Sequence, residues 1–468
     1  MYTYQEVSPL YTDLYQLTMA QAYFKNGMHE ERASFDYFFR KLPFKGGYVV
    51  FAGLQNFLEL TENLRFTDRD LDFLLNSEFD KDFVDHLKSF KFKGDIISVR
   101  EGDVVFPFEP VVRVEGSLLE TQLVETLLLN VLNFQSLIAT KASRIRFAAG
   151  NRSLSDFGLR RAQSFGAMQA SRAAIIGGFN STSNVLASRN YRIPHAGTMA
   201  HSFIESFGDE ISAFRAYAKA FPDNTTFLVD TYNTLTSGIP NAIKVAKEMR
   251  EKGHLPKAIR LDSGDLAYLS KKAREMLDYD GFNEVKIVVS NQLDEYVIRS
   301  LIEQKAPIDI FGVGTNLITG KPDAALDGVY KLAHVNDRNV LKISDNLQKT
   351  TLPGRKKILR YFDREGYFYA DAVVMIDETD VGRMINPFEK LKSLSLEGFK
   401  CEELMYTAMK NGKITGVAES LQKINERLKT RLNLLPAEHQ RFDFPHIYKV
   451  GISEKVLKIR DELLLKYK

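Results

Sequence analysis

The middle of the chain repeats one pattern, in which a short apolar run ends in polar residues and a helical segment follows. Four such runs occur: TTFLVDTYN (225–233), KAIRLDSGD (257–265), KIVVSNQLD (286–294) and IDIFGVGTN (308–316). Each of the first three precedes a helical segment. Strands buried on both faces form continuous apolar runs rather than alternating ones, so the repeat predicts a parallel β/α architecture.

Two of the helical segments are predicted to be amphipathic. In 241–253 the apolar residues at helical spacing are Ala242, Val245, Ala246 and Met249. In 266–277 they are Leu266, Leu269, Ala273 and Met276. Spacing of three and four residues places apolar side chains on one helix face, so we expect these residues to face the sheet.

The loops after the four apolar runs are rich in Asp, Ser, Thr, Asn and Gly. In a closed barrel of parallel β/α units, the loops at the strand C-termini hold the chemistry. A doubly wound open sheet is the alternative, but it would need a glycine-rich dinucleotide loop and no GxGxxG motif occurs. We therefore expect an α/β fold with an irregular TIM-like β/α barrel.

The flanking segments have a different pattern. Residues 95–116 predict short antiparallel strands, followed from Ser117 by a long, mostly buried helix; residues 329–376 are β-rich again, and the chain ends in helical segments. We expect the N- and C-terminal segments to pack together as a second α+β domain. The expected division is 1–125 (with part of 385–468 packed on it), 126–340 for the barrel, and 341–468 for a β-rich then helical segment.

Composition excludes several classes of protein. The 468 residues include 63 basic and 60 acidic side chains, a formal charge of +3, without the strong basic excess of nucleic-acid or membrane-surface proteins. The single cysteine, Cys401, excludes an intramolecular disulfide. No signal peptide or long apolar run is found. We expect a cytoplasmic protein with no nucleic-acid or membrane partner.

Two motifs upstream of the repeats contain residues that suit anion chemistry. LSDFGLRRAQS (154–164) contains adjacent arginines, which can bind a phosphate or carboxylate bidentately or form surface ion pairs. AGTMAHSF (196–203) places His201 among small residues that leave room for a ligand, although a lone histidine is more often a packed or surface residue. His195 is a nearby alternative.

The strand-end motifs RLDSGD (260–265) and FGVGTN (311–316) extend this picture. Carboxylates at a strand end suit a metal-bound diphosphate or sugar hydroxyls, and Asp262 and Ser263 could equally cap the next helix. Glycines in a turn let backbone N–H groups approach a phosphate. No zinc spacing, GxSxG or P-loop occurs. The residues alone predict a β/α-barrel enzyme for a phosphorylated sugar or nucleotide.

A set of ordered motifs is similar to the nicotinate phosphoribosyltransferase family. The motifs are TDLYQLTM, SFDYFFRKLP, SDFGLRRAQ, GGFNSTSN, GTMAHSF, VDTYN, RLDSGD and FGVGTN. The resemblance implies an enzyme that joins nicotinate to phosphoribosyl pyrophosphate, coupled to ATP hydrolysis, and makes nicotinate mononucleotide for NAD synthesis. It also implies Mg²⁺ as cofactor and a homodimer with active sites at the interface.

The resemblance also assigns roles to individual residues. It implies that His201 is transiently phosphorylated by ATP, that Arg260 and Asp262 lie near the pyridine and ribose, and that Asp230 lies near the ribose or the magnesium-bound diphosphate. The diphosphate would hold most of the magnesium, with Asp230 as the candidate protein ligand. The remaining substrate-binding residues implied are Phe157 (stacked on the pyridine), Tyr15 (covering the other ring face from the partner subunit), Ser183, Arg160, Gly314 and Thr315 (the last three at the 5′-phosphate), Arg40 of the partner subunit, and Asp13.

Ser183 separates nicotinate from nicotinamide as the expected substrate. The nicotinamide enzyme has an aspartate at this position of GGFNSTSN, which would repel a carboxylate substrate, whereas a serine can donate a hydrogen bond to it. Nicotinamide phosphoribosyltransferase remains the alternative, and quinolinate phosphoribosyltransferase is a weaker one because its chain is usually shorter and uses no ATP. A catalytically dead, nucleotide-binding barrel is the alternative from another class.

Overall fold

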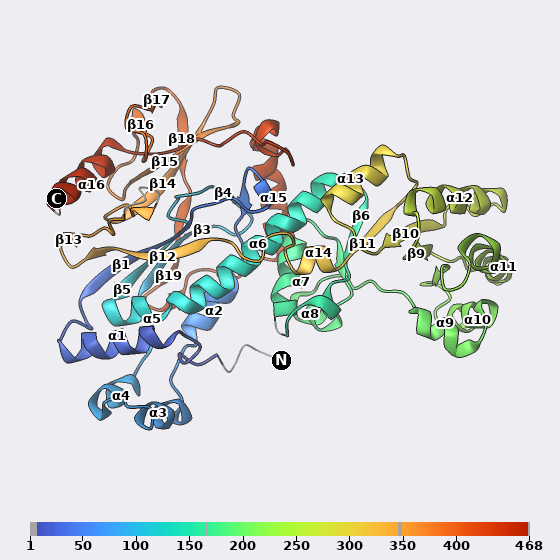
Figure 1. Ribbon diagram of the computed structural model, residues 1–468, viewed down its shortest axis with the longest axis horizontal. Helices are drawn as coiled ribbons and strands as arrows, with labels where there is room; N and C mark the ends of the chain where they lie inside the picture. Colours follow the sequence, from blue (N-terminus) through green and yellow to red (C-terminus); the bar gives the residue numbers. More distant parts are fainter. Residues whose placement is uncertain (1–6, 165, 345–348, 467–468) are drawn as a thin grey trace. The chain divides into compact units, whose positions relative to one another are not determined.

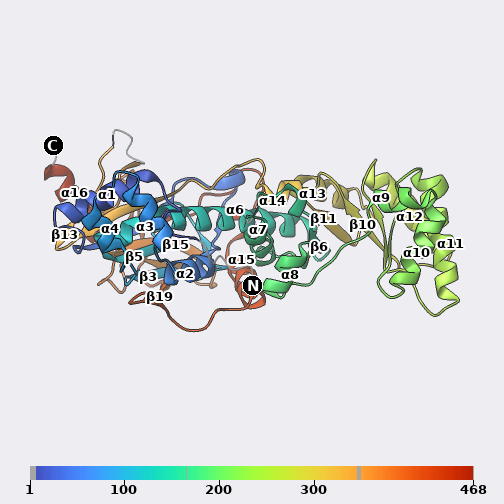
Figure 2. The ribbon, with the colours of Figure 1, turned by 90° about the horizontal axis from the view of Figure 1, so that it is seen from below.

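The computed structural model describes residues 7–164, 166–344 and 349–466 and divides into two compact units. One unit combines residues 1–140 with 325–468, and the other comprises residues 141–324. Figure 1 and Figure 2 show the first unit built from the blue and the orange-to-red ends of the chain, and the second from the green and yellow middle. The three-segment division expected from the sequence stays a prediction. Among the described residues, no helix is long and apolar enough to cross a membrane.

The middle unit contains one parallel six-stranded sheet in the order β7-β6-β11-β10-β9-β8. Its strands are β6 (Ser153–Asp156), β7 (Ser181–Thr182), β8 (Thr226–Leu228), β9 (Ala258–Leu261), β10 (Lys286–Ser290) and β11 (Ile310–Val313). Its helices are α7 (Gly166–Ile176), α8 (Val185–Tyr191), α9 (His201–Phe207), α10 (Glu210–Ala220), α11 (Ile239–Arg250), α12 (Leu266–Tyr279), α13 (Glu295–Glu303) and α14 (Thr315–Ile318).

The predicted strand–loop–helix repeat is confirmed by this unit. The apolar runs that form β8, β9 and β10 are each followed by a helix, and all six strands are parallel. In the described part of the chain no ladder joins the edge strands β7 and β8; an isolated bridge between Thr182 and His195 extends the β7 edge. The α/β class is therefore confirmed, and full TIM-like closure stays a prediction.

The amphipathic helices bear out one predicted face and correct the other. In α11 the four residues expected to face the core are all buried. In α12 the buried residues are instead Ala267, Ser270, Ala273 and Leu277. Leu266, Leu269 and Met276 are only half-buried. Ala273 is thus buried as predicted, and the other three predicted residues are replaced on the buried face by Ala267, Ser270 and Leu277. Three of the four buried side chains are small, which allows a helix to pack closely.

The other unit brings the two ends of the chain into common sheets, as expected for the second α+β domain. A seven-stranded antiparallel sheet has the order β13-β12-β1-β5-β3-β19-β20, so C-terminal strands border N-terminal ones on both sides. A six-stranded sheet, β17-β16-β21-β15-β14-β18, and a β2–β4 pair complete it. The strands are β1 (Arg32–Phe39), β2 (Val49–Val50), β3 (Asp95–Val99), β4 (Val104–Val105), β5 (Val112–Ser117), β12 (Gly328–Val335), β13 (Arg338–Asn339), β14 (Lys356–Phe362), β15 (Phe368–Met375), β16 (Arg383–Ile385), β17 (Ser393–Ser395), β18 (Lys400–Glu403), β19 (Met405–Lys410), β20 (Lys413–Ile414) and β21 (Val450–Ile452).

The helix expected after β5 is two helices in the structure. Ser117 and Glu120 form a reciprocal capping box that starts the first helix, which ends at Leu123, and the next begins at Glu125. The helices of this unit are α1 (Leu14–Lys25), α2 (Leu54–Glu62), α3 (Asp68–Leu75), α4 (Lys81–Leu87), α5 (Leu118–Leu123), α15 (Leu421–Leu434) and α16 (Glu454–Lys466); α6 (Glu125–Ala149) starts in this unit and ends in the other.

A fully buried ion network joins β14 and β15 in the terminal unit. Arg360 pairs with Asp371 through N–H groups at 2.6–3.1 Å, and its Nη1 donates to Asp103 at 2.9 Å. Burial opposes the charge on Arg360, but Asp371 and Asp103 raise its pKa above the ordinary value. Tyr448 also donates to Asp371 at 2.9 Å. The second Nη2 bond of Arg360 goes to the Val104 carbonyl, so four of its five N–H bonds meet an acceptor inside the core.

Candidate active site

Polar side chains gather at the carboxyl edge of the parallel sheet in the middle unit. Asp156 and Ser290 are the last residues of β6 and β10, Asp230 lies two residues after β8, and Asp262 directly follows β9. Carboxyl ends of parallel strands meet at one edge, where α/β proteins bind their ligands. The polar residues that follow the predicted strands therefore lie together at this edge of the sheet.

Arg260 is held in one orientation by three neighbours. Its Nε donates to Ser290 Oγ at 2.8 Å, Nη1 donates to Thr198 Oγ1 at 2.8 Å, and Nη2 donates to Asp262 Oδ1 at 3.0 Å. Ser290 also donates to the same Asp262 oxygen. A guanidinium restrained in this way is preorganised for an anionic or carbonyl group of a ligand.

Asp230 ties the β8 and β9 loops together and retains one free oxygen. Its Oδ2 accepts the Asp262 N–H and the Ser263 hydroxyl, each at 2.7 Å. Its Oδ1 is buried and has no hydrogen-bond partner among the described residues. The hypothesis that Asp262 and Ser263 cap the next helix is wrong, because Asp265 accepts the Tyr268 N–H and caps α12.

His201 is the first residue of α9 and faces both carboxylates. Its Nε2 lies 3.8 Å from Asp262 Oδ2 and 4.0 Å from Asp230 Oδ1. Its Nδ1 makes a hydrogen bond of 3.0 Å with Thr231 Oγ1, and 39% of the side chain is exposed. The imidazole is thus accessible to a ligand while one nitrogen is anchored. His195, by contrast, is exposed, and its Nδ1 makes a hydrogen bond of 3.4 Å with Ser188 Oγ.

Phe157 lies flat against a glycine of β11. A Cβ atom placed on Gly312 would come within 2.5 Å of the Phe157 ring, so a side chain there would displace the ring. The Arg260 guanidinium lies 5.4 Å from the ring centroid. Gly312 therefore makes room for an aromatic side chain. The sequence-based expectation that a glycine of this turn brings its backbone close to a phosphate stays a prediction for Gly314.

Asp156 is a buried scaffold residue beneath the site. It accepts hydrogen bonds from Ser171 and Thr182 at 2.7 and 2.8 Å and from the Gly158 N–H at 2.8 Å. Burial raises its pKa, although these bonds act to lower it. Its carbonyl accepts the Ser183 N–H at 2.8 Å, which places Ser183 beside β6. The Ser183 side chain is half-buried and its hydroxyl makes no hydrogen bond to another described residue.

The residues expected at the 5′-phosphate lie in the loops after β6 and β11. Arg160 is exposed in a short 3₁₀ turn, Leu159–Arg161. Gly314 precedes α14 and Thr315 begins it, both half-buried. Because β6 and β11 are paired neighbours, these loops leave the same sheet edge side by side.

Asp13, Tyr15 and Arg40 belong to the terminal unit. Tyr15 is 48% exposed on α1, which begins just after Asp13. Asp13 accepts a hydrogen bond of 3.1 Å from Thr126. Arg40 directly follows β1, and its Nε is buried without a hydrogen-bond partner in the described part of the chain. These residues do not belong to the unit that holds His201 and Arg260.

The strand-end carboxylates fit a divalent cation that is held mainly by a ligand. The free Asp230 Oδ1 and Asp262 Oδ2 are hard oxygen donors, which suit magnesium. They do not form a three-ligand cluster; within the described ranges the compact cluster of that kind is His29, Glu30 and His86, in the other unit. A metal here would therefore take further ligands from a bound diphosphate.

Sequence reasoning missed four residues that build this site. Ser290 lies at a strand end in the same manner as Asp262 and could have been found by that rule. Thr198 and Thr231 lie inside motifs already singled out, GTMAHSF and VDTYN, but nothing local indicates that they contact Arg260 and His201. The role of Gly312 as a seat for Phe157 depends on a contact between β11 and the loop after β6.

Comparison with known proteins gives one consistent family. Three family models match: the nicotinate phosphoribosyltransferase (NAPRTase) N-terminal domain over residues 10–133, the NAPRTase family over 152–379, and the nicotinate phosphoribosyltransferase C-terminal domain over 355–460. Nicotinate phosphoribosyltransferase of Bacillus subtilis is 43% identical over 95% of this chain and 93% of its own. That of Caenorhabditis elegans is 37% identical over 98% and 94%.

A solved structure extends the similarity to the fold. Human nicotinic acid phosphoribosyltransferase aligns with a TM-score of 0.87 at 30% identity, covering 97% of this chain and 99% of that one. Nicotinate-nucleotide pyrophosphorylase from Pyrococcus furiosus aligns with a TM-score of 0.71 at 24% identity, which supports the fold alone.

Proposed function

Since this chain belongs to the nicotinate phosphoribosyltransferase family, we propose that its strand-end cluster carries out phosphoribosyl transfer to nicotinate and couples it to ATP through His201. The enzyme joins nicotinate to phosphoribosyl pyrophosphate and forms nicotinate mononucleotide. With ATP coupling, the balance is nicotinate, phosphoribosyl pyrophosphate, ATP and water to nicotinate mononucleotide, pyrophosphate, ADP and phosphate. The observation that carries the proposal is the convergence of His201, Asp230, Asp262 and Arg260 at one sheet edge.

Transfer requires positioning and charge stabilisation rather than a strong base. The nicotinate ring nitrogen attacks the anomeric carbon as the bond to pyrophosphate breaks, so positive charge develops on the ribose. Phe157 would stack on the pyridine, and Arg260, fixed by Ser290, Thr198 and Asp262, would orient the substrate. Preorganised groups of this kind lower the barrier because they need no rearrangement during the reaction.

Magnesium would be held by the substrate diphosphate together with Asp230 Oδ1 and Asp262 Oδ2. When bound, it would neutralise charge on the departing pyrophosphate. The negative charge of the two carboxylates would also favour the oxocarbenium-like state, because positive charge develops on the ribose. Asp230 also holds the β9 loop in register through the Asp262 N–H.

His201 is the proposed phosphoryl acceptor. In the tautomer that carries its proton on Nδ1, beside the Thr231 hydroxyl, the lone pair on Nε2 would attack the γ-phosphorus of ATP, and the bond to the β-phosphate oxygen would break to release ADP. Water later cleaves the P–N bond and releases phosphate. Thr231 therefore orients the ring, and its hydroxyl can accept the Nδ1 proton in the reactive tautomer.

The deciding measurement is nicotinate mononucleotide formation with and without Mg-ATP in wild type, His201→Ala and His195→Ala. We expect ATP stimulation in wild type and His195→Ala and none in His201→Ala, and an acid-labile label on the protein from γ-labelled ATP that only His201→Ala loses. Stimulation that survives in His201→Ala would contradict the phosphohistidine. Product from nicotinamide but not nicotinate would favour the nicotinamide enzyme instead.

We further propose a homodimer in which Asp13, Tyr15 and Arg40 of the partner subunit complete each site. The exposed ring of Tyr15 and the unpartnered Nε of Arg40 are available for such a role. Mixing Tyr15→Ala with Phe157→Ala tests it: random exchange should restore about one quarter of wild-type activity, because half of the dimers carry one intact site. No recovery from dimers shown to exchange would contradict shared sites.

A further inference from the structure

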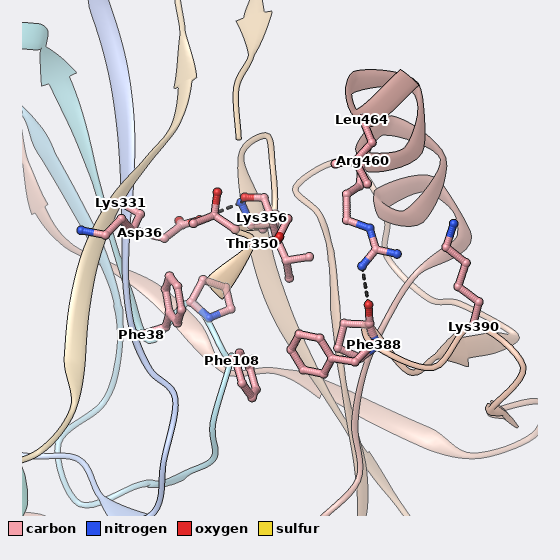
Figure 3. A pocket seen from close by; sticks show the side chains of 14 residues that line it. Asp36, Phe38, Phe108, Lys331, Thr350, Lys356, Phe388, Lys390, Arg460 and Leu464 are labelled. Carbon is pink, nitrogen blue, oxygen red and sulfur yellow. Dashed lines mark hydrogen bonds and ion pairs between the residues drawn. The ribbon is translucent and has the colours of Figure 1, made fainter. Parts of the chain in front are cut away.

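The terminal unit contains a cavity of about 200 Å³ that none of the proposed catalytic residues lines. Figure 3 shows it between the strands that carry Asp36 and Phe38 and the helix that carries Arg460 and Leu464. A dry cavity of about 150 Å³ holds a benzene ring, so this one is large enough for a planar ring system. The lining residues are Asp36, Phe38, Phe108, Pro110, Lys331, Thr350, Thr351, Leu352, Lys356, Pro387, Phe388, Lys390, Arg460 and Leu464.

The walls of the cavity are aromatic and apolar in the middle. Phe108 and Phe388 meet edge to face with ring centroids 4.7 Å apart, and Phe38 lies across from Phe388 (Figure 3). Pro110 also lines the cavity. Flat faces of this kind stack on a heterocycle, which excludes water from both sides of the ring. The middle of the cavity therefore suits an aromatic base.

One end of the cavity offers an unused hydrogen-bond acceptor. Asp36 is 3% exposed; its Oδ2 pairs with Lys356 Nζ at 2.7 Å, whereas its Oδ1 is buried with no partner in the described residues. Lys356 cannot serve both oxygens, because its other two protons go to the Leu352 and Gly354 carbonyls at 2.8 and 2.5 Å. A buried acceptor without a donor is costly, so a ligand that donates here gains the missing bond.

The opposite end offers an unused donor and positive charge. Arg460 is 6% exposed, and its Nη1 donates to the Pro387 carbonyl at 2.5 Å. Its Nε is buried without a hydrogen-bond partner among the described residues; Asp461 Oδ1 lies 3.6 Å away. Lys390, 57% exposed, stands at the mouth and pairs with Asp461 at 2.8 Å. This end suits an anionic group that can reach both cations.

We propose that this cavity binds an aminopurine nucleotide. The base lies between Phe38 and the Phe108–Phe388 pair with its exocyclic amine donating to Asp36 Oδ1, and the ribose phosphate extends past Arg460 to the exposed Lys390. The cavity holds the base, and the phosphate lies in the open part, where it stays largely hydrated. The site belongs to the terminal unit and uses none of the strand-end residues.

Calorimetric titration of the purified full-length protein with AMP tests the proposal, with IMP, adenosine and inorganic phosphate as comparisons. We expect AMP to bind about tenfold more tightly than IMP, whose carbonyl replaces the amine that Asp36 requires. Adenosine should bind more weakly than AMP because it lacks the phosphate. Equal affinity for AMP and IMP would overturn the assignment of Asp36, and binding of phosphate alone with the affinity of AMP would overturn a base site.

Three variants locate the binding. Leu464→Trp should fill the cavity and abolish AMP binding. Lys390→Ala should weaken it about threefold to fivefold, whereas Lys392→Ala, a nearby exposed lysine paired with Glu389 outside the cavity, should not change it. If Leu464→Trp unfolds the protein, the comparison of Lys390→Ala with Lys392→Ala still tests whether AMP binds in the cavity.

Phe157→Ala distinguishes this cavity from the strand-end site. AMP binding that persists in Phe157→Ala supports the cavity, whether or not the proposed transfer function holds. AMP binding that disappears in Phe157→Ala but survives in the lysine variants would place the nucleotide at the strand ends and overturn the proposal.

Discussion

Two arginine–aspartate clusters of nearly the same chemistry occur in this molecule and serve different ends. Arg260 in the middle unit and Arg360 in the terminal unit each contact aspartates across neighbouring strands or loops. Arg360 is completely buried, and four of its five N–H bonds are donated to protein acceptors, among them both of its aspartate partners. Arg260 is only partly buried, and its neighbours Asp230 and Asp262 keep oxygens without hydrogen-bond donors in the described residues.

The difference shows that free capacity, rather than residue type, marks the functional cluster. A buried network in which the charged groups are paired with one another stabilises one packing arrangement. The strand-end cluster also holds its arginine, through three hydrogen bonds, but leaves acceptors and an imidazole open to a ligand. The following changes separate the two roles.

Removing the buried arginine should have the largest effect on stability. Arg360→Met leaves Asp371 buried without its counter-charge and removes one of the two arginines paired with Asp103, the other being Arg431. We therefore expect the free energy of unfolding to fall by about 3–5 kcal/mol. Urea titration followed by circular dichroism measures it. Arg383→Met, an exposed arginine 3.9 Å from its carboxylate partner, is the control and should change stability by less than about 0.5 kcal/mol. Equal losses in both variants would refute the structural role.

Removing the strand-end arginine should instead reduce catalysis. Arg260→Met should lower kcat/KM about 10²- to 10³-fold, because a preorganised donor is lost from the site, with little change in the urea midpoint. Arg215→Met, which breaks an exposed pair with Glu248 on the same unit, should retain wild-type kcat/KM. A large loss of stability in Arg260→Met with unchanged kcat/KM would make this cluster structural as well.

The specificity of the site should change at Ser183. Ser183→Asp places a negative charge beside the proposed nicotinate carboxylate, and we expect kcat/KM for nicotinate to fall about tenfold or more by like-charge repulsion. Ser183→Ala removes only the hydroxyl and should have a smaller effect. Unchanged use of nicotinate by the aspartate variant, measured as nicotinate mononucleotide formation, would refute the proposed position of the substrate carboxylate.

The smallest effect concerns the pH dependence contributed by Asp156. Its pKa is raised by burial above 3.8, so the folded state holds this proton more tightly than the unfolded state. The stability from this group is complete below the unfolded pKa and is lost as pH rises through the folded pKa. The stability of wild type relative to Asp156→Asn should therefore decrease over that interval in urea titrations at stepped pH. A difference that grows with pH would contradict the raised pKa.

Several parts of the site could be predicted because they depend on neighbours in sequence. Asp262 follows its strand, and Ser117 and Glu120 cap a helix, as local patterns indicate. The packed face of α12 was predicted correctly only at Ala273, because the small Ala267 and Ser270 are buried there while Leu266, Leu269 and Met276 are only half-buried. The contact of Thr198 with Arg260 spans 62 residues, and no local periodicity contains it.

The sequence by itself determined the alternation of strands and helices and the polar residues at the strand ends, because hydrophobic periodicity reflects short-range sterics and hydrogen bonding. Its ordered motifs also indicated the family of the chain. The tertiary structure alone decided the strand order β7-β6-β11-β10-β9-β8 and the joining of both chain ends in one sheet. It also decided which arginine became buried: Arg360 meets Asp103 across 257 residues. Such partners depend on packing between distant segments, where burial and the supply of hydrogen-bond partners separate a structural ion pair from a site with atoms left to bind a ligand.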